Sequence, residues 1–185
     1  MMKFLIMILI FSFVPSIGQA DAEAGKEKAQ FCMLCHKPNF SSASIPLLAG
    51  QKREYLYKQI KDFKEKRRPS SFMQMNVANL SDQDMHDIAD YFSSLEVIRE
   101  TFSLDSVKIN QGESKAEELK CASCHMADFS GDKEVPSLVA IDPIYIMNQL
   151  VAFQTGNRLH PLINSSTRIS ESDTEDLAQY FAQLE

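Results

Sequence analysis

The 185-residue chain lacks several features that would point to common classes of protein. It has no glycine-rich phosphate loop, and no grouping of side chains resembles an enzymatic triad or a pair of catalytic acids. No stretch alternates apolar and polar residues in the manner of a half-buried β-strand. After residue 20, no segment is apolar enough to span a bilayer. These absences direct attention to helices and to the few cysteines.

Basic charge is scarce in the second half of the chain. Residues 21–98 carry 11 Lys and Arg against 11 Asp and Glu, whereas residues 99–185 carry 7 against 14. Because binding to nucleic-acid phosphates requires a basic face, we expect no nucleic-acid partner.

The first twenty residues have the pattern of a secretory signal. Lys3 precedes an apolar run over residues 4–14, and the small residues Gly18 and Ala20 predict cleavage after Ala20. The apolar run is shorter than the roughly 20 residues that a membrane-spanning helix needs. We therefore expect a signal peptide over residues 1–20 and a periplasmic mature protein, with an uncleaved membrane anchor as the alternative.

The mature sequence is an internal duplication. CMLCH at residues 32–36 returns as CASCH at residues 121–125, and these two motifs contain all four cysteines. Further residues of the first half recur in the second at offsets of 90 or 89, among them Pro46, Tyr55, Gln59, Phe63, Arg68, Ser81 and Asp84. We predict a first domain over residues 21–97, a linker over 98–108 and a second domain over 109–185. The repeated tyrosines and glutamines (Tyr55, Gln59, Tyr145 and Gln149) are expected in the cores or between the domains.

Each half is predicted to be all-α, with three helices. The first helix leads into the CxxCH motif, over residues 23–31 in one half and from residue 112 in the other. The second covers residues 52–66, where apolar side chains recur at spacings of three and four. The third begins at Ser81, with its counterpart at Ser170. An aspartate three residues after each serine predicts a capping box.

The CxxCH motifs indicate a covalent cofactor. CxxC by itself fits a redox dithiol, a structural disulfide or part of a zinc site, but a histidine directly after the second cysteine is the signal for haem c attachment. The two thiols then bond to the haem vinyl groups, and the imidazole supplies an axial nitrogen to iron. We expect two haem c groups, held by Cys32, Cys35, His36, Cys121, Cys124 and His125.

The sequence resembles the dihaem cytochrome c4 family over essentially its whole mature length. Beside the CxxCH motifs, the resemblance is carried by Pro46-Leu47-Leu48-Ala49-Gly50-Gln51, by Tyr55 with Gln59, and by Leu80-Ser81-Asp82-Gln83-Asp84. It implies two tandem class I cytochrome c domains, each enclosing one haem c. In that family an axial methionine lies seven residues before the leucine of the Leu-Ser-Asp element. That position is Met73 here, in a predicted loop, with Met75 as the alternative.

The second half departs from the family pattern. The position equivalent to Met73 is Leu162, and residues 158–164 contain no methionine. His160 is the candidate sixth ligand of the second iron, and a vacant or water-bound position is the alternative. Met147 is expected to pack in the core. Because the axial ligand strongly affects the potential of a haem, we expect two distinct redox waves.

The resemblance implies an electron carrier rather than an enzyme. Electrons would pass from a bc-type complex or another dehydrogenase to a terminal oxidase or another acceptor, with peripheral association at the membrane and no stable small-molecule substrate. The alternative is a haem protein with an open second iron, used for ligand sensing or small-molecule redox catalysis. The sequence also has a basic run, which comprises Lys61, Lys64, Lys66, Arg67 and Arg68. This run either docks an acidic redox partner or forms a solvated helix face. In the second case Arg68, together with Arg158, is expected to neutralise haem propionates.

Overall fold

The computed structural model describes residues 17–39, 42, 45–98 and 101–184. These residues form α-helices and one 3-10 helix, and their only β-type pairing is an isolated bridge between Asp132 and Val135. The all-α prediction is confirmed. Residues 1–16 of the predicted signal peptide and residues 99–100 of the predicted linker lie outside the described residues. No helix of the described part is both long enough and apolar enough to cross a membrane.

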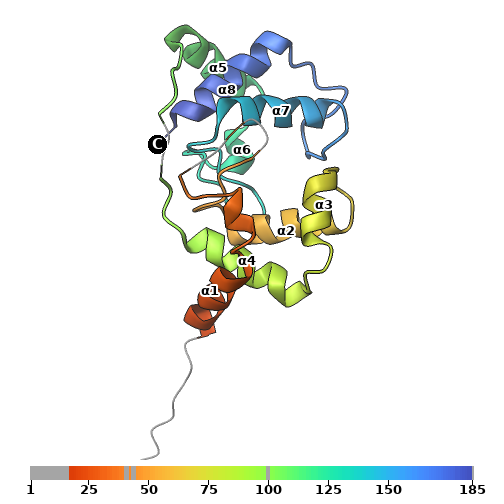
Figure 1. Ribbon diagram of the computed structural model, residues 1–185. Helices are drawn as coiled ribbons and strands as arrows, with labels where there is room; N and C mark the ends of the chain where they lie inside the picture. Colours follow the sequence, from red (N-terminus) through yellow and green to blue (C-terminus); the bar gives the residue numbers. More distant parts are fainter. Residues whose placement is uncertain (1–16, 40–41, 43–44, 99–100, 185) are drawn as a thin grey trace, which may run out of the picture.

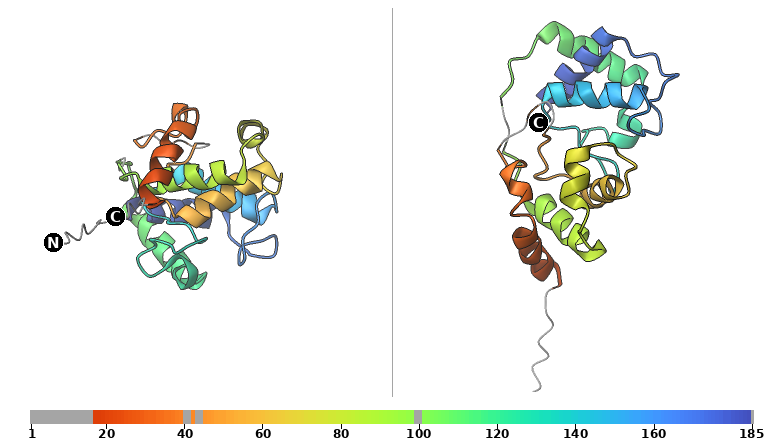
Figure 2. Two further views of the ribbon diagram at one scale, coloured as in Figure 1. Left: turned by 90° about the horizontal axis from the view of Figure 1, so that it is seen from below. Right: turned by 45° about the vertical axis from the view of Figure 1, so that its right-hand side comes forward.

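The helices follow the predicted repeat. The first half contains α1 (Ile17–Lys28), a 3-10 helix (Cys32–Leu34), α2 (Arg53–Lys64), α3 (Ser71–Val77) and α4 (Asp82–Ser94). The second half contains α5 (Ser106–Glu118), α6 (Ala122–His125), α7 (Pro143–Gln154) and α8 (Glu171–Gln183). The two halves lie on opposite sides of the molecule, and α2 faces α7 across the middle (Figures 1 and 2).

The last helix of each half begins with the predicted capping box. The Ser81 hydroxyl accepts a hydrogen bond from the Asp84 N–H at 3.1 Å, and the Asp84 carboxylate accepts one from the Ser81 N–H at 2.9 Å. Ser170 and Asp173 repeat this exchange at 3.1 and 3.0 Å. Each box satisfies backbone N–H groups that the start of a helix leaves without intrahelical partners. The helix starts predicted at Ser81 and Ser170 are confirmed.

A glycine allows the first and last helices of each half to cross closely. A Cβ atom on Gly25 would lie 2.0 Å from the carbonyl oxygen of Asp87, and one on Gly112 would lie 2.1 Å from that of Asp176. Only glycine therefore lets α1 pack on α4, and α5 on α8, in this way. The helices enclose two separate hydrophobic clusters, one in each half.

Several helix boundaries differ from those predicted. α1 ends at Lys28, and a 3-10 turn follows it where the prediction continued the helix to residue 31. α5 begins at Ser106, within the predicted linker, because the Asp105 carboxylate caps it by accepting a hydrogen bond from the Val107 N–H at 2.8 Å. The division into domains at residues 21–97 and 109–185 stays a prediction.

The halves differ most in the segment before their last helix. The loop predicted around Met73 is instead the short helix α3, where the Ser70 hydroxyl caps the first turn by accepting from the Met73 N–H at 3.3 Å. The equivalent residues 155–169 form turns and no helix. Pro161 in that segment has no N–H for a helical hydrogen bond. The second half therefore presents a differently shaped loop toward its CxxCH motif.

Candidate haem sites

Each CxxCH motif is wound into a helical turn. The His36 N–H donates to the Cys32 carbonyl at 2.8 Å, and the His125 N–H donates to the Cys121 carbonyl at 3.1 Å. In such a turn, residues three and four apart share a face. The motif spacing therefore brings two thiols and one imidazole to the same side of the chain, where they fit the edge and the metal of one planar cofactor. No disulfide joins any of the four cysteines, all of which lie in the described part of the chain.

The two motif histidines are held in the tautomer that binds a metal through Nε2. His36 Nδ1 lies 3.0 Å from the Pro46 carbonyl oxygen, and His125 Nδ1 lies 2.9 Å from that of Pro136. Since a carbonyl only accepts, Nδ1 carries the proton and Nε2 keeps its lone pair. Burial lowers the pKa of both imidazoles, which keeps them neutral. This orientation of a ligand by a carbonyl is typical of metal-binding histidines.

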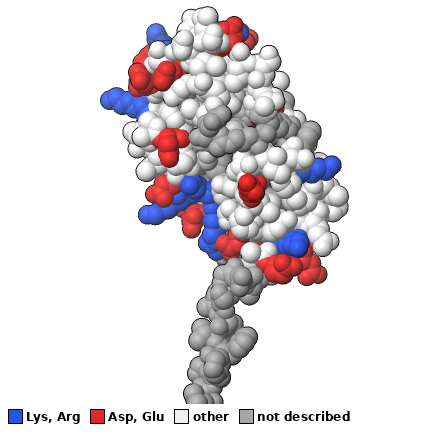
Figure 3. All heavy atoms as spheres, turned by 90° about the vertical axis from the view of Figure 1, so that its left-hand side faces the viewer, with Lys and Arg blue, Asp and Glu red and all other residues white. Residues whose placement is uncertain are grey.

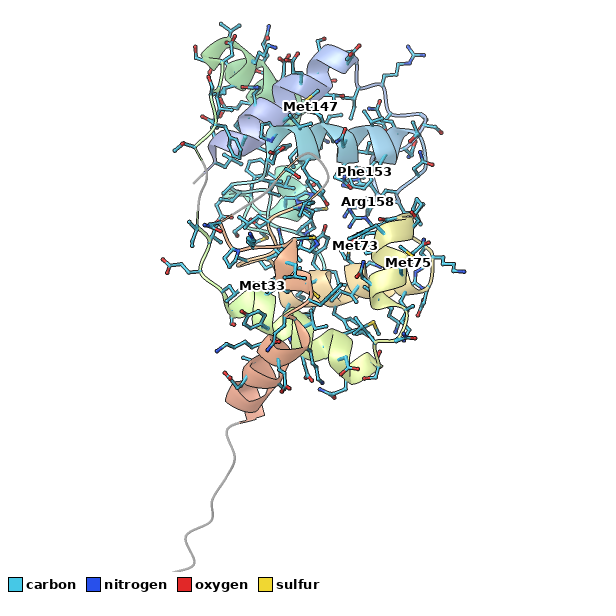
Figure 4. All side chains as sticks on the ribbon, viewed as in Figure 1. Met33, Met73, Met75, Met147, Phe153 and Arg158 are labelled. Carbon is cyan, nitrogen blue, oxygen red and sulfur yellow. The ribbon has the colours of Figure 1, made fainter. Side chains whose placement is uncertain are left out.

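The two candidate methionines of the first half differ in exposure. Met75 is 71% exposed, whereas Met73 is half-buried. In Figure 4, Met73 lies on the side of α3 that faces the middle of the molecule. A thioether must face the interior to reach an iron, so the geometry favours Met73.

The second half brings His160 opposite His125. Their ring centroids are 6.3 Å apart and their planes differ by 10°. A metal lies about 2.0–2.1 Å from an imidazole nitrogen, and the ring centroid lies about 1 Å further away, so one metal between two imidazoles separates their centroids by roughly 6 Å. The observed separation fits that span. The predicted pair is thus brought together, while Met147 packs against the hydrophobic cluster as expected.

The hydrogen bonds of His160 differ from those of the motif histidines. Its Nδ1 accepts from the Leu162 N–H at 3.1 Å and from the Ile163 N–H at 3.0 Å. Nδ1 is therefore unprotonated, and the proton of the neutral ring is on Nε2. Burial, then the nearby His125 and Arg158, lower the pKa of His160 to about 4. Binding a metal through Nε2 would require the ring to give up these two bonds.

A polar cluster joins the halves between α2 and α7. Arg68 and Arg158 each donate to both Gln59 and Gln149, at 2.7–3.0 Å. Each arginine also donates to a tyrosine of the opposite half, Arg68 to Tyr145 at 2.9 Å and Arg158 to Tyr55 at 2.7 Å. These tyrosines and glutamines are thus contacts between the halves, which was one of the two predicted alternatives. Figure 4 shows Arg158 between α7 and α3.

Arg68 and Arg158 are suited to pair with the propionate groups of a haem. No ion pair found among the described residues includes Arg68 or Arg158, although both side chains are half-buried. A buried cation is stable only with a counter-charge or many hydrogen bonds. Haem propionates would supply that charge.

Two residues of the remaining basic run have acidic partners within their own half. Arg67 pairs with Asp62 at 2.7 Å and also with Glu65, and Lys61 lies 4.0 Å from Asp82 and donates to the Tyr57 hydroxyl at 3.1 Å. These contacts favour a solvated helix face over a docking site. On a different face of the molecule, shown in Figure 3, acidic and basic side chains are interspersed over a largely uncharged surface.

Comparison with known proteins agrees with this arrangement. The Cytochrome c family model matches residues 22–96. Cytochrome c4 of Pseudomonas aeruginosa is 33% identical, with both chains covered in full. The chain belongs to the cytochrome c4 family. Cytochrome c4 of Azotobacter vinelandii is 29% identical, again with full coverage of both chains.

A solved structure supports the fold of this family member over most of its length. Reduced recombinant cytochrome c4 from Pseudomonas stutzeri superposes with a TM-score of 0.77 at 30% identity, covering 89% of this chain and 98% of that one. The predicted fold and the two covalent haem c groups are therefore confirmed. The protein is a dihaem electron-transfer cytochrome that works with redox partners.

Proposed function

We propose that the protein carries electrons in the periplasm through two haems with different axial ligands. His36 and Met73 ligate the first iron, and His125 and His160 ligate the second. The thioether bonds are made by Cys32, Cys35, Cys121 and Cys124. The observation that carries this proposal is the 6.3 Å separation of the His125 and His160 rings, in a half whose distal loop has no methionine.

The chain's residues hold and tune the haems, which supply one-electron chemistry when bound. Thioether ligation raises a haem potential, and an imidazole in its place gives a lower one. The carbonyls of Pro46 and Pro136 orient the proximal rings, and Arg68 with Arg158 neutralises the propionates.

We infer that the donor is a bc-type complex or another dehydrogenase and that the acceptor is a terminal oxidase or another acceptor at the membrane. Small, transient contacts are usual for such redox encounters. The predicted signal segment supports a periplasmic location, and the uncleaved alternative would instead tether the protein to the membrane. The protein acts as a carrier rather than as a catalyst.

One observation favours the second candidate function, a haem with an open iron that binds small ligands. His160 Nδ1 is engaged by two backbone N–H groups, which oppose the tautomer needed for ligation through Nε2. If these bonds persist in the holoprotein, the second iron keeps a free position.

Carbon monoxide binding to the reduced protein distinguishes the two functions. We expect the wild type to bind no carbon monoxide, and His160→Ala to bind one equivalent with a spectral change at one haem. His86→Ala, which removes a histidine of α4, serves as the matched control and should behave as the wild type. Stoichiometric binding by the wild type would favour the open iron. An unchanged spectrum in His160→Ala would remove His160 as a ligand.

A further inference from the structure

Gln51 joins the first half to a single residue of the second half. Its Nε2 donates to the Ser137 carbonyl at 2.9 Å, and its Oε1 accepts from the Ser137 N–H at 2.8 Å. Gln51 is buried, with 9% exposure, and its Oε1 also accepts from the Lys52 N–H at 3.1 Å. This two-way bond fixes the position of the amide against the backbone of the other half. Sequence reasoning placed Gln51 in a family element but did not predict this contact.

The contact reaches a proximal histidine through one peptide group. The Ser137 N–H that Gln51 binds belongs to the same peptide as the Pro136 carbonyl. That carbonyl accepts the Nδ1 proton of His125 at 2.9 Å. Hydrogen bonds linked in this way polarise one another, so a bond on the N–H side makes the carbonyl a stronger acceptor.

The first half has no matching connection. The Pro46 carbonyl accepts from His36 at 3.0 Å, but no hydrogen bond to the N–H of Leu47, in the same peptide, is found in the described part of the chain. The repeat also places Ile141 where the first half has Gln51. The connection therefore runs in one direction, from the first half to the second haem site.

We propose that Gln51 is a positioning residue that makes the properties of the second haem depend on the docking of the two halves. By strengthening the Pro136 acceptor, it increases the basicity of the His125 ring and so favours the ferric state. The inference rests on the proposed axial role of His125, and it is independent of the sixth ligand. Separation or reorientation of the halves would therefore raise the reduction potential of the second haem and leave that of the first haem unchanged.

Proton NMR of the reduced holoprotein under carbon monoxide tests this. Low-spin ferrous iron is diamagnetic with any sixth ligand, so an incorrect assignment of His160 does not affect the measurement. The Nδ1 protons of His125 and His36 are assigned through their contacts with Pro136 and Pro46. In Gln51→Met, which keeps the side-chain length without the amide, we expect the His125 proton to move upfield and exchange faster, with that of His36 unchanged. A redox titration should show an upward shift of one wave only.

Gln51→Glu provides a second variant. Its carboxylate has no N–H to donate to the Ser137 carbonyl and repels that oxygen, so the two-way bond is broken and the His125 proton should again move upfield. Ser137→Ala is the matched control, because it keeps both backbone groups that Gln51 binds and should leave the two protons in place. Equal responses of His125 and His36, or no response of either in both Gln51 variants, would overturn the proposal.

Discussion

At the scale of single residues, hydrogen-bond partners decide which imidazole nitrogen can bind iron. His36 and His125 donate Nδ1–H to carbonyls, which leaves Nε2 as a ligand. His160 accepts at Nδ1 from two N–H groups, which leaves a proton on Nε2. The same side chain is thus prepared for ligation at two positions, whereas at the third the ring must give up its two N–H bonds before Nε2 can bind iron.

The two methionines of α3 should respond differently to truncation. Met73→Ala removes the proposed sulfur ligand, so we expect the weak Met-to-iron absorption to vanish and the first haem potential to fall by on the order of 0.2 V, a fraction of the roughly 0.8 V range set by axial ligands. Met75→Ala, which truncates a side chain that is 71% exposed, should leave both unchanged. Redox titration followed by absorption checks this. Loss of the band in Met75→Ala alone would reverse the assignment.

At the scale of helices, packing overrides intrinsic preference. Glycine in a helix interior is less favourable than alanine by about 1 kcal/mol. Gly25 and Gly112 nevertheless occupy equivalent places in α1 and α5, where a Cβ would overlap the backbone of α4 or α8. The close crossing of the helices therefore requires the residue that each helix by itself disfavours.

Gly25→Ala should destabilise the first half despite the better helix propensity of alanine. Overpacking against the Asp87 carbonyl outweighs the propensity gain, and we expect a net loss of about 2 kcal/mol in the free energy of unfolding. Denaturant unfolding of the holoprotein measures the change. Glu27→Ala, at an exposed position of the same helix, should stay within about 0.5 kcal/mol of the wild type. Equal stabilities of the two variants would contradict the close crossing.

At the scale of the whole molecule, the halves are joined by polar contacts as well as by the chain. Arg68 of the first half donates to Tyr145 of the second, and Arg158 of the second half donates to Tyr55 of the first. Since Tyr55 and Tyr145 are equivalent in the repeat, the contact has approximate two-fold symmetry. Gln51 breaks that symmetry, because its bonds to Ser137 have no counterpart at Ile141. The two haem sites therefore differ both in their distal loops and in their dependence on docking.

Removing one hydroxyl from this contact should weaken the association of the halves. Tyr55→Phe and Tyr145→Phe each delete the acceptor of an arginine from the other half, and we expect each to lower the free energy of unfolding by about 1.5 kcal/mol. Tyr57→Phe deletes a hydroxyl bonded within the first half at an exposed site and should cost about 0.5 kcal/mol or less. Calorimetry of the three variants checks that Tyr55→Phe and Tyr145→Phe each lose more unfolding free energy than Tyr57→Phe. A larger loss in Tyr57→Phe would show that the cluster does not stabilise the docked state.

Local patterns in the sequence were sufficient for the features that depend on a few neighbouring residues. Ser81 and Ser170 predicted the capping boxes because a cap involves only four consecutive residues. The CxxCH spacing predicted two haems because one helical turn brings its three side chains together. The repeat and its missing methionine predicted two different sites.

Only the tertiary structure decided how distant segments meet. The parallel approach of His160 to His125 and the bond from Gln51 to Ser137 depend on contacts between segments far apart in the chain. Sequence analysis could name His160 but could not show that its Nδ1 accepts two N–H groups. The direction of a ring, and hence which nitrogen is free, is set by the folded loop around it.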